Sequence, residues 1–201
     1  DWRFLSNRVG VDLTFYKTNT INQLLRLGLP TASGFSEKYI NAGDIENRGI
    51  ELSLNFVPVK TDKLTWDATL NFARNKNEII ELDEQIKQSF LAGGYGRTAG
   101  PVVTEGGAFG DLYTLRWANT ETDGTFTYTD NGNARIVDAA GKPVVTSASE
   151  KIGNFNPDFT LGLNNSFTFG KLNFSFLIDG RKGGVVVSGT DANAAFYGNA
   201  D

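Results

Sequence analysis

The side chains that could do chemistry in this sequence are carboxylates, amides, hydroxyls and lysines, because its 201 residues include no His, Cys or Met. This composition excludes Ser-His-Asp and Cys-His catalysis, zinc sites made of His or Cys, and disulfides within the chain. A glycosidase-like acid pair could come from four carboxylates that lie close together in the sequence: Glu37, Asp44, Glu46 and Glu51. Such a pair needs a defined separation between its carboxyl groups, and no pattern in the sequence fixes one. We therefore expect loop or inward-facing charges here and no enzymatic activity.

One segment rich in Asp, Asn and Gly is a candidate calcium loop. It contains Asp123-Gly124, the run Asp130-Asn131-Gly132-Asn133, and Asp138 further on. The ligand order of an EF-hand calcium loop is missing, and so is the bidentate Glu that closes such a loop. We expect polar hairpin turns here, with calcium as the alternative, and we predict no cofactor.

Two glycine-rich stretches, Gly93-Gly94-Tyr95-Gly96 and Gly106-Gly107, could cradle a phosphate. Neither is followed by Gly-Lys-Ser/Thr, and neither lies between a predicted strand and a predicted helix. The 19 basic residues are outnumbered by 23 acidic ones, which gives a net charge of -4 without a Lys/Arg-rich run. We therefore predict a loop at the glycines, and no nucleotide or nucleic-acid partner.

Aromatic side chains in the predicted loops are the candidates for contact with a ligand. Sugar rings stack on such faces, and Tyr95 and Trp117 are the two residues that we predict to touch a substrate. Tyr113 and Tyr197 belong to the same set of loop aromatics. Because Tyr113, Leu115 and Trp117 alternate, the alternative is that they pack a hairpin within the loop.

The elements that must position these residues are strands, because apolar side chains recur at every second position wherever a period exists. An example is Ile50, Leu52, Leu54 and Phe56, which alternate with Gly, Glu, Ser and Asn. The same alternation predicts five strands, each with one apolar and one polar face. They cover residues 8–16, 47–57, 64–75, 158–169 and 172–180.

The connections between these strands alternate in length. Short turns are predicted around 59–63 and 170–171, and long loops over 19–45 and 76–157. Within the second loop, the spacing of Ile79, Ile80, Leu82 and Ile86 predicts a short helix in a charged run. Short turns at one end of the sheet and long loops at the other are typical of an outer-membrane barrel.

Aromatic residues at two levels along the strands also favour a membrane barrel, since aromatic girdles mark both membrane interfaces. Phe15, Tyr16 and Phe72 fall near the long-loop end. The set near the short turns is Phe56, Trp66, Phe167, Phe169 and Phe174. Five strands cannot close a barrel, so we expect residues 1–201 to be an internal piece of a longer transmembrane β-barrel protein.

Three segments resemble one family, the SusC/RagA-type TonB-dependent outer-membrane receptors of Bacteroidetes. They are NAGDIENRGIELSLN (41–55), LTWDATLNFARNKNEI (64–79) and IGNFNPDFTLGLNNSF (152–167). The stretches GGVVVSGT (183–190) and AFYG (195–198) fit as well. In the first segment, Gly43 and Gly49 are expected to permit positive φ where a loop joins a strand.

The resemblance implies a 22-stranded barrel in the Gram-negative outer membrane, filled by an N-terminal plug that this chain lacks. It also implies uptake of an oligosaccharide, or less often an oligopeptide, with energy from TonB and under a SusD-like surface lipoprotein. The chain would then form part of the C-terminal half of the barrel, in contact with membrane lipid. The alternatives are a soluble β-sandwich that binds carbohydrate or acts as an adhesin, and an outer-membrane enzyme on a similar barrel.

Overall fold

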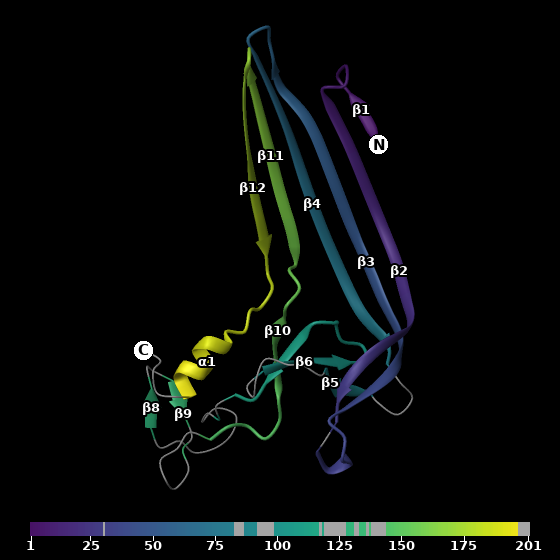
Figure 1. Ribbon diagram of the computed structural model, residues 1–201, viewed down its shortest axis with the longest axis vertical. Helices are drawn as coiled ribbons and strands as arrows, with labels where there is room; N and C mark the ends of the chain where they lie inside the picture. The colour runs from purple at the N-terminus through teal and green to yellow at the C-terminus, as the bar shows by residue number, and fades with distance from the viewer. Residues whose placement is uncertain are drawn as a thin grey trace.

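A computed structural model describes residues 1–29, 31–82, 87–91, 99–116, 118, 128–130, 133–135, 137 and 144–196. Its main feature is an antiparallel six-stranded sheet in the order β1-β2-β3-β4-β11-β12 (Figure 1). The strands are β1 (Trp2–Phe4), β2 (Val9–Gly28), β3 (Glu37–Lys60), β4 (Leu64–Glu81), β11 (Phe159–Phe169) and β12 (Leu172–Lys182). All five predicted strands are confirmed, and β1 adds a sixth at the edge.

The short turns lie at one end of this sheet and the long connections at the other. The turns β3–β4 and β11–β12 lie together at the top of Figure 1, and the described elements between β4 and β11 lie at the bottom. β11 pairs with β4 along its length, for example Leu163 with Leu70, although this long connection separates them in sequence. The prediction that the short turns lie at one end of the sheet and the long connections at the other is therefore confirmed.

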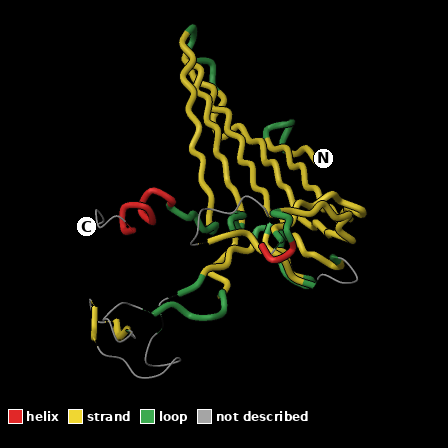
Figure 2. The backbone as a smooth tube through the Cα atoms, turned by 60° about the horizontal axis from the view of Figure 1, so that its bottom comes forward, coloured by secondary structure: helices red, strands yellow, loops and turns green. Residues whose placement is uncertain are grey.

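Side chains of one parity form apolar rows across the sheet, on a face that we call the outward face. One row runs through Val11, Leu54, Leu70, Leu163 and Ile178. Phe15 on this face is 71% exposed, and in the described part of the chain no second layer packs on it (Figure 2). A soluble sandwich would bury such a face against a second sheet, so the architecture does not fit the sandwich alternative.

Aromatic rings gather on the outward face near the short turns. The rings of Trp66 and Phe167 stack at 5.3 Å, and Phe167 stacks on Phe176 at 6.2 Å. Trp66 Nε1 donates a hydrogen bond of 3.2 Å to Oδ1 of Asn165, a polar side chain on the same face that is only 4% exposed. This bond supplies the partner that an amide requires away from water.

The predicted loop 19–45 is mostly strand, and its boundaries were wrong. β2 and β3 stay paired as far as Gly28 and Glu37, and the connection contains the short 3-10 helix η1 (Thr31–Ser33). Leu25 and Ile40 in this extension are buried. The alternation fails there because the extension packs into a core, so its residues no longer divide between one outer and one inner face.

The predicted helix after residue 76 is also wrong, because β4 continues to Glu81. Asp44 pairs with Glu81 but Ile45 pairs with Ile79, so Ile80 is an extra residue in β4. Such a β-bulge breaks the period of two and leaves a spacing that resembles that of a helix. Ile79 is fully buried whereas Ile80 is exposed. Residues 83–86 lie outside the described part of the chain.

The predicted loop 76–157 also contains a second sheet, which we call the loop platform. Its strands, in the order β10-β7-β6-β5, are β5 (Gln88–Phe90), β6 (Ala99–Thr104), β7 (Asp111–Thr114) and β10 (Glu150–Asn154). It lies at the end of the main sheet away from the short turns (Figure 1). A hydrophobic core joins the two sheets and consists of Leu25, Ile40, Ile45, Ile79, Leu82 and Val103.

Two small elements complete the described structure. The hairpin of β8 (Tyr128–Asp130) and β9 (Asn133–Arg135) lies in the segment considered for calcium, while Asp123 and Asp138 lie outside the described residues. The helix α1 (Gly189–Phe196) follows β12. Neither α1 nor any other helix in the described ranges has the length and hydrophobicity to cross a membrane.

Gly43 and Gly49 are required by close packing and not by positive φ, which corrects the sequence interpretation. A Cβ atom at Gly49 would collide with the ring of Tyr16, which lies over this glycine on the inward face. Tyr16 therefore does not belong to an outward aromatic girdle. A Cβ at Gly43 would lie 2.9 Å from the carbonyl oxygen of Glu81, at the bulge of β4.

The two faces should respond differently to a charge. We expect Leu70→Arg to lower the free energy of unfolding in phospholipid vesicles by about 2–4 kcal/mol, the cost of Arg on a lipid-facing barrel position near mid-membrane. Ser53→Arg, on the inward face opposite Asp12, is the matched control and should cost much less. Urea titration of the complete barrel containing this sheet would measure both, and equal costs would refute the assignment of faces.

Candidate functional site

The candidate site has two parts, the inward face of the main sheet and the loop platform at its outer end. On the inward face, one row of paired residues consists of Asp12, Ser53, Asn71, Gly162 and Asp179. A shallow hollow over this row is also lined by Thr14 and Glu51. Carboxylates, amides and hydroxyls of this kind suit a polar interior and can hydrogen-bond to hydroxyl-rich or amide-rich groups.

Amide side chains fix the inward face further toward the platform. The hydroxyl of Tyr16 donates to Oδ1 of Asn75 at 3.1 Å, and Nδ2 of Asn75 donates to Oδ1 of Asn47 at 3.0 Å. These two hydrogen bonds link β2 to β4 and β4 to β3. It holds the Tyr16 ring over Gly49 and keeps the three strands in register where they leave the apolar rows.

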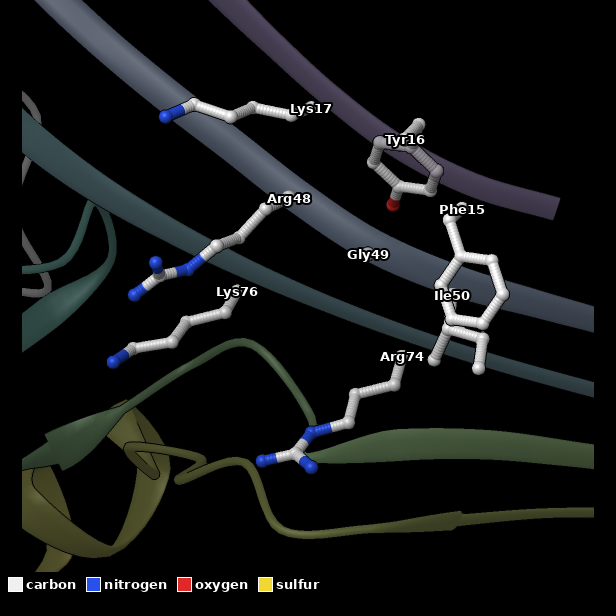
Figure 3. A pocket seen from close by; sticks show the side chains of 8 residues that line it. All are labelled: Phe15, Tyr16, Lys17, Arg48, Gly49, Ile50, Arg74 and Lys76. Carbon is white, nitrogen blue, oxygen red and sulfur yellow. The ribbon is translucent and has the colours of Figure 1, made fainter.

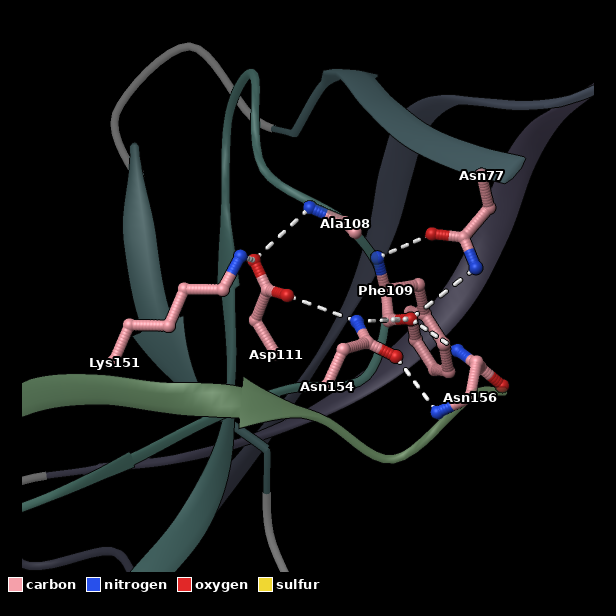
Figure 4. Close-up of polar contacts among 7 residues, drawn as sticks. All are labelled: Asn77, Ala108, Phe109, Asp111, Lys151, Asn154 and Asn156. Carbon is pink, nitrogen blue, oxygen red and sulfur yellow. Dashed lines mark hydrogen bonds and ion pairs between the residues drawn. The ribbon is translucent and has the colours of Figure 1, made fainter. Parts of the chain in front are cut away.

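Asn77 then connects β4 to the loop platform (Figure 4). Its Oδ1 accepts a 2.6 Å hydrogen bond from the backbone N–H of Phe109, and its Nδ2 donates to the carbonyl of Phe109 at 3.2 Å. The same carbonyl accepts a 2.8 Å bond from Nδ2 of Asn156. One loop peptide is therefore tied both to the barrel strand and to the segment that leads into β11.

A buried carboxylate organises the platform beside this junction (Figure 4). Asp111 is 3% exposed and accepts hydrogen bonds from Nζ of Lys151 at 2.7 Å, Nδ2 of Asn154 at 2.8 Å and the backbone N–H of Ala108 at 3.2 Å. A buried charge needs such partners to offset the loss of hydration. The network thus joins β7 to β10.

One part of this network falls in a segment that the sequence analysis singled out, and the other part does not. Asn154 and Asn156 fall within the 152–167 segment that carries the family resemblance, and Oδ1 of Asn154 accepts a 2.7 Å bond from the N–H of Asn156. Asp111 and Lys151 were not among the predicted site residues. Neither belongs to a short motif, and they meet because β7 and β10 are paired.

The predicted substrate contacts Tyr95 and Trp117 lie outside the described residues, as does Tyr197. Tyr113 is described: it is half-buried on β7, where it pairs with Lys151 of β10 and with Gly100 of β6. This position is consistent with the alternative that it packs a sheet within the loop.

Three of the four carboxylates considered for catalysis have a basic or amide partner of their own. Glu37 pairs with Arg26 at 3.4 Å, Glu46 pairs with Lys17 at 2.9 Å, and Asp44 accepts two 2.8 Å bonds from Asn19. Glu51 lies on the opposite face from Glu46, since their positions differ in parity. In the ranges that the structure describes, no group of three or more acidic side chains is placed to hold a metal ion.

Removing the buried carboxylate should loosen the loop platform without disturbing the main sheet. Asp111→Ala leaves the Ala108 N–H without its acceptor and removes the shorter of the two hydrogen bonds of Asn154 Nδ2. The loss of a partner costs about 1–3 kcal/mol for a buried group. We expect faster amide hydrogen exchange in 99–114 and 150–156, and unchanged exchange in β2 and β3. Asp62→Ala in the exposed β3–β4 turn is the control, and equal effects of the two changes would contradict this role.

The sequence is similar to known receptors along most of its length. The chain is 27% identical to the TonB-dependent receptor P3 of Formosa agariphila, over 94% of this chain and 20% of the relative. It is 29% identical to the TonB-dependent receptor P26 of the same organism, over 90% of this chain and 19% of the relative. The TonB-dependent receptor SusC of Bacteroides thetaiotaomicron is 36% identical over 41% of this chain and 8% of its own length. No family model matches the sequence.

Solved structures support the same fold. The RagAB peptide transporter aligns with 87% of this chain and 19% of its own, with a TM-score of 0.64 and 23% identity. A second RagAB structure, of the peptide importer in a closed-closed state, gives a TM-score of 0.62. The chain thus spans about a fifth of the length of the relatives that match most of it. With its two-faced sheet, short turns at one end and platform at the other, the chain is an outer-membrane β-barrel segment similar to the SusC/RagA-type TonB-dependent receptors.

Proposed function

We propose that this segment belongs to a receptor that imports an oligosaccharide, or alternatively an oligopeptide, across the outer membrane with energy from TonB. The observation that carries this proposal is the two-faced sheet ending in a folded platform of loops, within a chain similar to TonB-dependent receptors. The sheet forms part of the rigid wall of the barrel, and the platform offers a surface outside the membrane where the cargo can bind. In this role the segment binds and does not catalyse.

We also propose that Tyr95 and Trp117 contact the cargo from loops that the platform anchors. The stretch 92–98 connects β5 to β6, two paired strands of the platform. On either side of Trp117, Ala118 N–H donates to the Val144 carbonyl at 2.8 Å, and the Arg116 carbonyl accepts from Thr146 N–H at 2.9 Å. Loops anchored on both sides present a side chain at low entropic cost, which favours binding.

A SusD-like surface lipoprotein is the partner that we propose for the platform side of the barrel. This end carries the long connections, which are extracellular in barrels of this kind. We place the contact with TonB in a part of the receptor outside this segment. The proposal for the lipoprotein is supported by the similarity to SusC and RagAB and by the existence of a folded, polar platform at this end.

The function is tested by uptake in the host organism with labelled glucan oligomers, uronate oligomers and peptides as probes. Deletion of the receptor gene should abolish uptake of one class, and deletion of TonB should do the same. In cells with the receptor, Trp117→Ala should lower uptake of that class about tenfold at low concentration, equivalent to about 1.4 kcal/mol of binding.

Trp2→Ala provides the matched control, because Trp2 lies on β1 at the short-turn end, far from the platform. It should leave uptake unchanged while the receptor stays in the membrane. Unchanged uptake of every probe after deletion of the gene would disprove a role in the import of these classes. Equal losses with Trp2→Ala and Trp117→Ala would remove the proposed role of Trp117.

A further inference from the structure

Four basic side chains come together on the outward face, at the end of the apolar rows nearest the platform. They are Lys17 on β2, Arg48 on β3, and Arg74 and Lys76 on β4, and we call them the basic rim. Lys17 pairs with Arg48, and Arg48 pairs with Lys76, so three cations form one continuous row across three strands. Like charges directly opposite each other destabilise a sheet, so pairing of the strands does not by itself explain this row.

The basic rim borders a hollow whose other side is apolar (Figure 3). Phe15 and Ile50 lie on the side of the apolar rows, and Ile50 pairs with Arg74. The four basic side chains extend in the same direction, toward the platform end of the sheet (Figure 3). An amphiphile fits this arrangement, with its hydrocarbon along the apolar rows and a charged head at the cations.

The height of the rim corresponds to the outer edge of the membrane. Arg74 lies ten positions beyond Leu64, the first residue of β4 after the short turn. Ten residues of a strand span about 34 Å, or about 26 Å across a bilayer for a strand tilted by about 40°, close to the apolar band of about 25 Å in outer-membrane barrels. Short turns face the periplasm in such barrels. The rim therefore lies at the headgroup level of the outer leaflet.

The rim retains positive charge after its own ion pairs are counted. Glu46, which is 8% exposed, pairs with Lys17 at 2.9 Å and with Arg48 at 3.9 Å, and Glu78 pairs with Arg48 at 3.7 Å. For Arg74 and Lys76 the described structure contains no ion pair. Four cations against two carboxylates leave an excess of two positive charges, in a chain whose net charge is -4.

Phosphate is the anion that this set of side chains fits. The planar guanidinium groups of Arg48 and Arg74 can each donate two parallel hydrogen bonds to it, and the lysines add point charges. A phosphate monoester carries up to two negative charges and so matches the excess. We propose that the basic rim binds the phosphorylated head of an outer-leaflet glycolipid, whose acyl chains lie on the apolar rows. This site rests on the placement of the sheet in the membrane and not on the proposed cargo.

The test compares two lipids in phosphatidylcholine nanodiscs that hold the complete receptor: lipid A, and lipid A from which the phosphates have been removed. Native mass spectrometry and lipid titration would give the affinity of each. We expect lipid A to bind at least tenfold more tightly, and the double variant Arg74→Gln/Lys76→Gln to remove that difference. Equal binding of the two lipids to the unaltered receptor would overturn the proposal.

Arg181→Gln is the matched control, because Arg181 pairs with Thr160, which pairs with Ala73, next to Arg74 but on the inward face. It should leave the preference for lipid A intact, and an equal loss would refute a local site. Inorganic phosphate should compete only weakly; strong competition would identify a site for free phosphate and overturn the lipid assignment. The double variant should remain folded by gel shift on heating and should still import cargo, so failure of this proposal is distinguishable from failure of the proposed function.

Discussion

The constraint on which the rest of this structure depends is that backbone N–H and C=O groups inside a membrane have no water to bond with. In a strand each must pair with a neighbouring strand, so strands cross only as part of a continuous ladder. β2 and β3 provide one from Val9 and Phe56 to Gly28 and Glu37, and β4 and β11 extend it sideways. This ladder sets which residues share a face and at which height each residue lies.

The outer end of the ladder shows how the chain changes when water becomes available. The bulge at Ile80 lets Ile79 turn its backbone toward the platform, where it bonds to Gly106 and Gly107 at 2.8 Å each. Around Ile79 the chain builds its hydrophobic core, whereas the membrane-level sheet has none. At this end apolar side chains are therefore buried by other parts of the protein and not by lipid. This core allows the platform to be a folded surface.

Polar and charged side chains at positions where the environment favours apolar ones show which interactions the fold requires. Asn165 lies among apolar side chains on the outward face, where the indole of Trp66 satisfies it. The basic rim ends the apolar rows with four cations on three adjacent strands. The carboxylate of Asp111 is buried, and its hydrogen bonds link β7 to β10 and to the turn at Ala108. Each exception is explained by a partner, either within the chain or, at the rim, in the membrane.

The sequence by itself determined the five strands, their two faces and the end at which the long connections lie, because side-chain alternation and turn residues act over a few positions. The resemblance in 41–55, 64–79 and 152–167 also indicated the similarity to TonB-dependent receptors that the comparisons found. The contact of Tyr95 and Trp117 with a substrate stays a prediction.

Only the tertiary structure decided that β2 and β3 extend to Gly28 and Glu37, that β4 continues through a bulge, and that Asp111 meets Lys151. Those features depend on partners that are distant in sequence, and no local pattern encodes the contact between them.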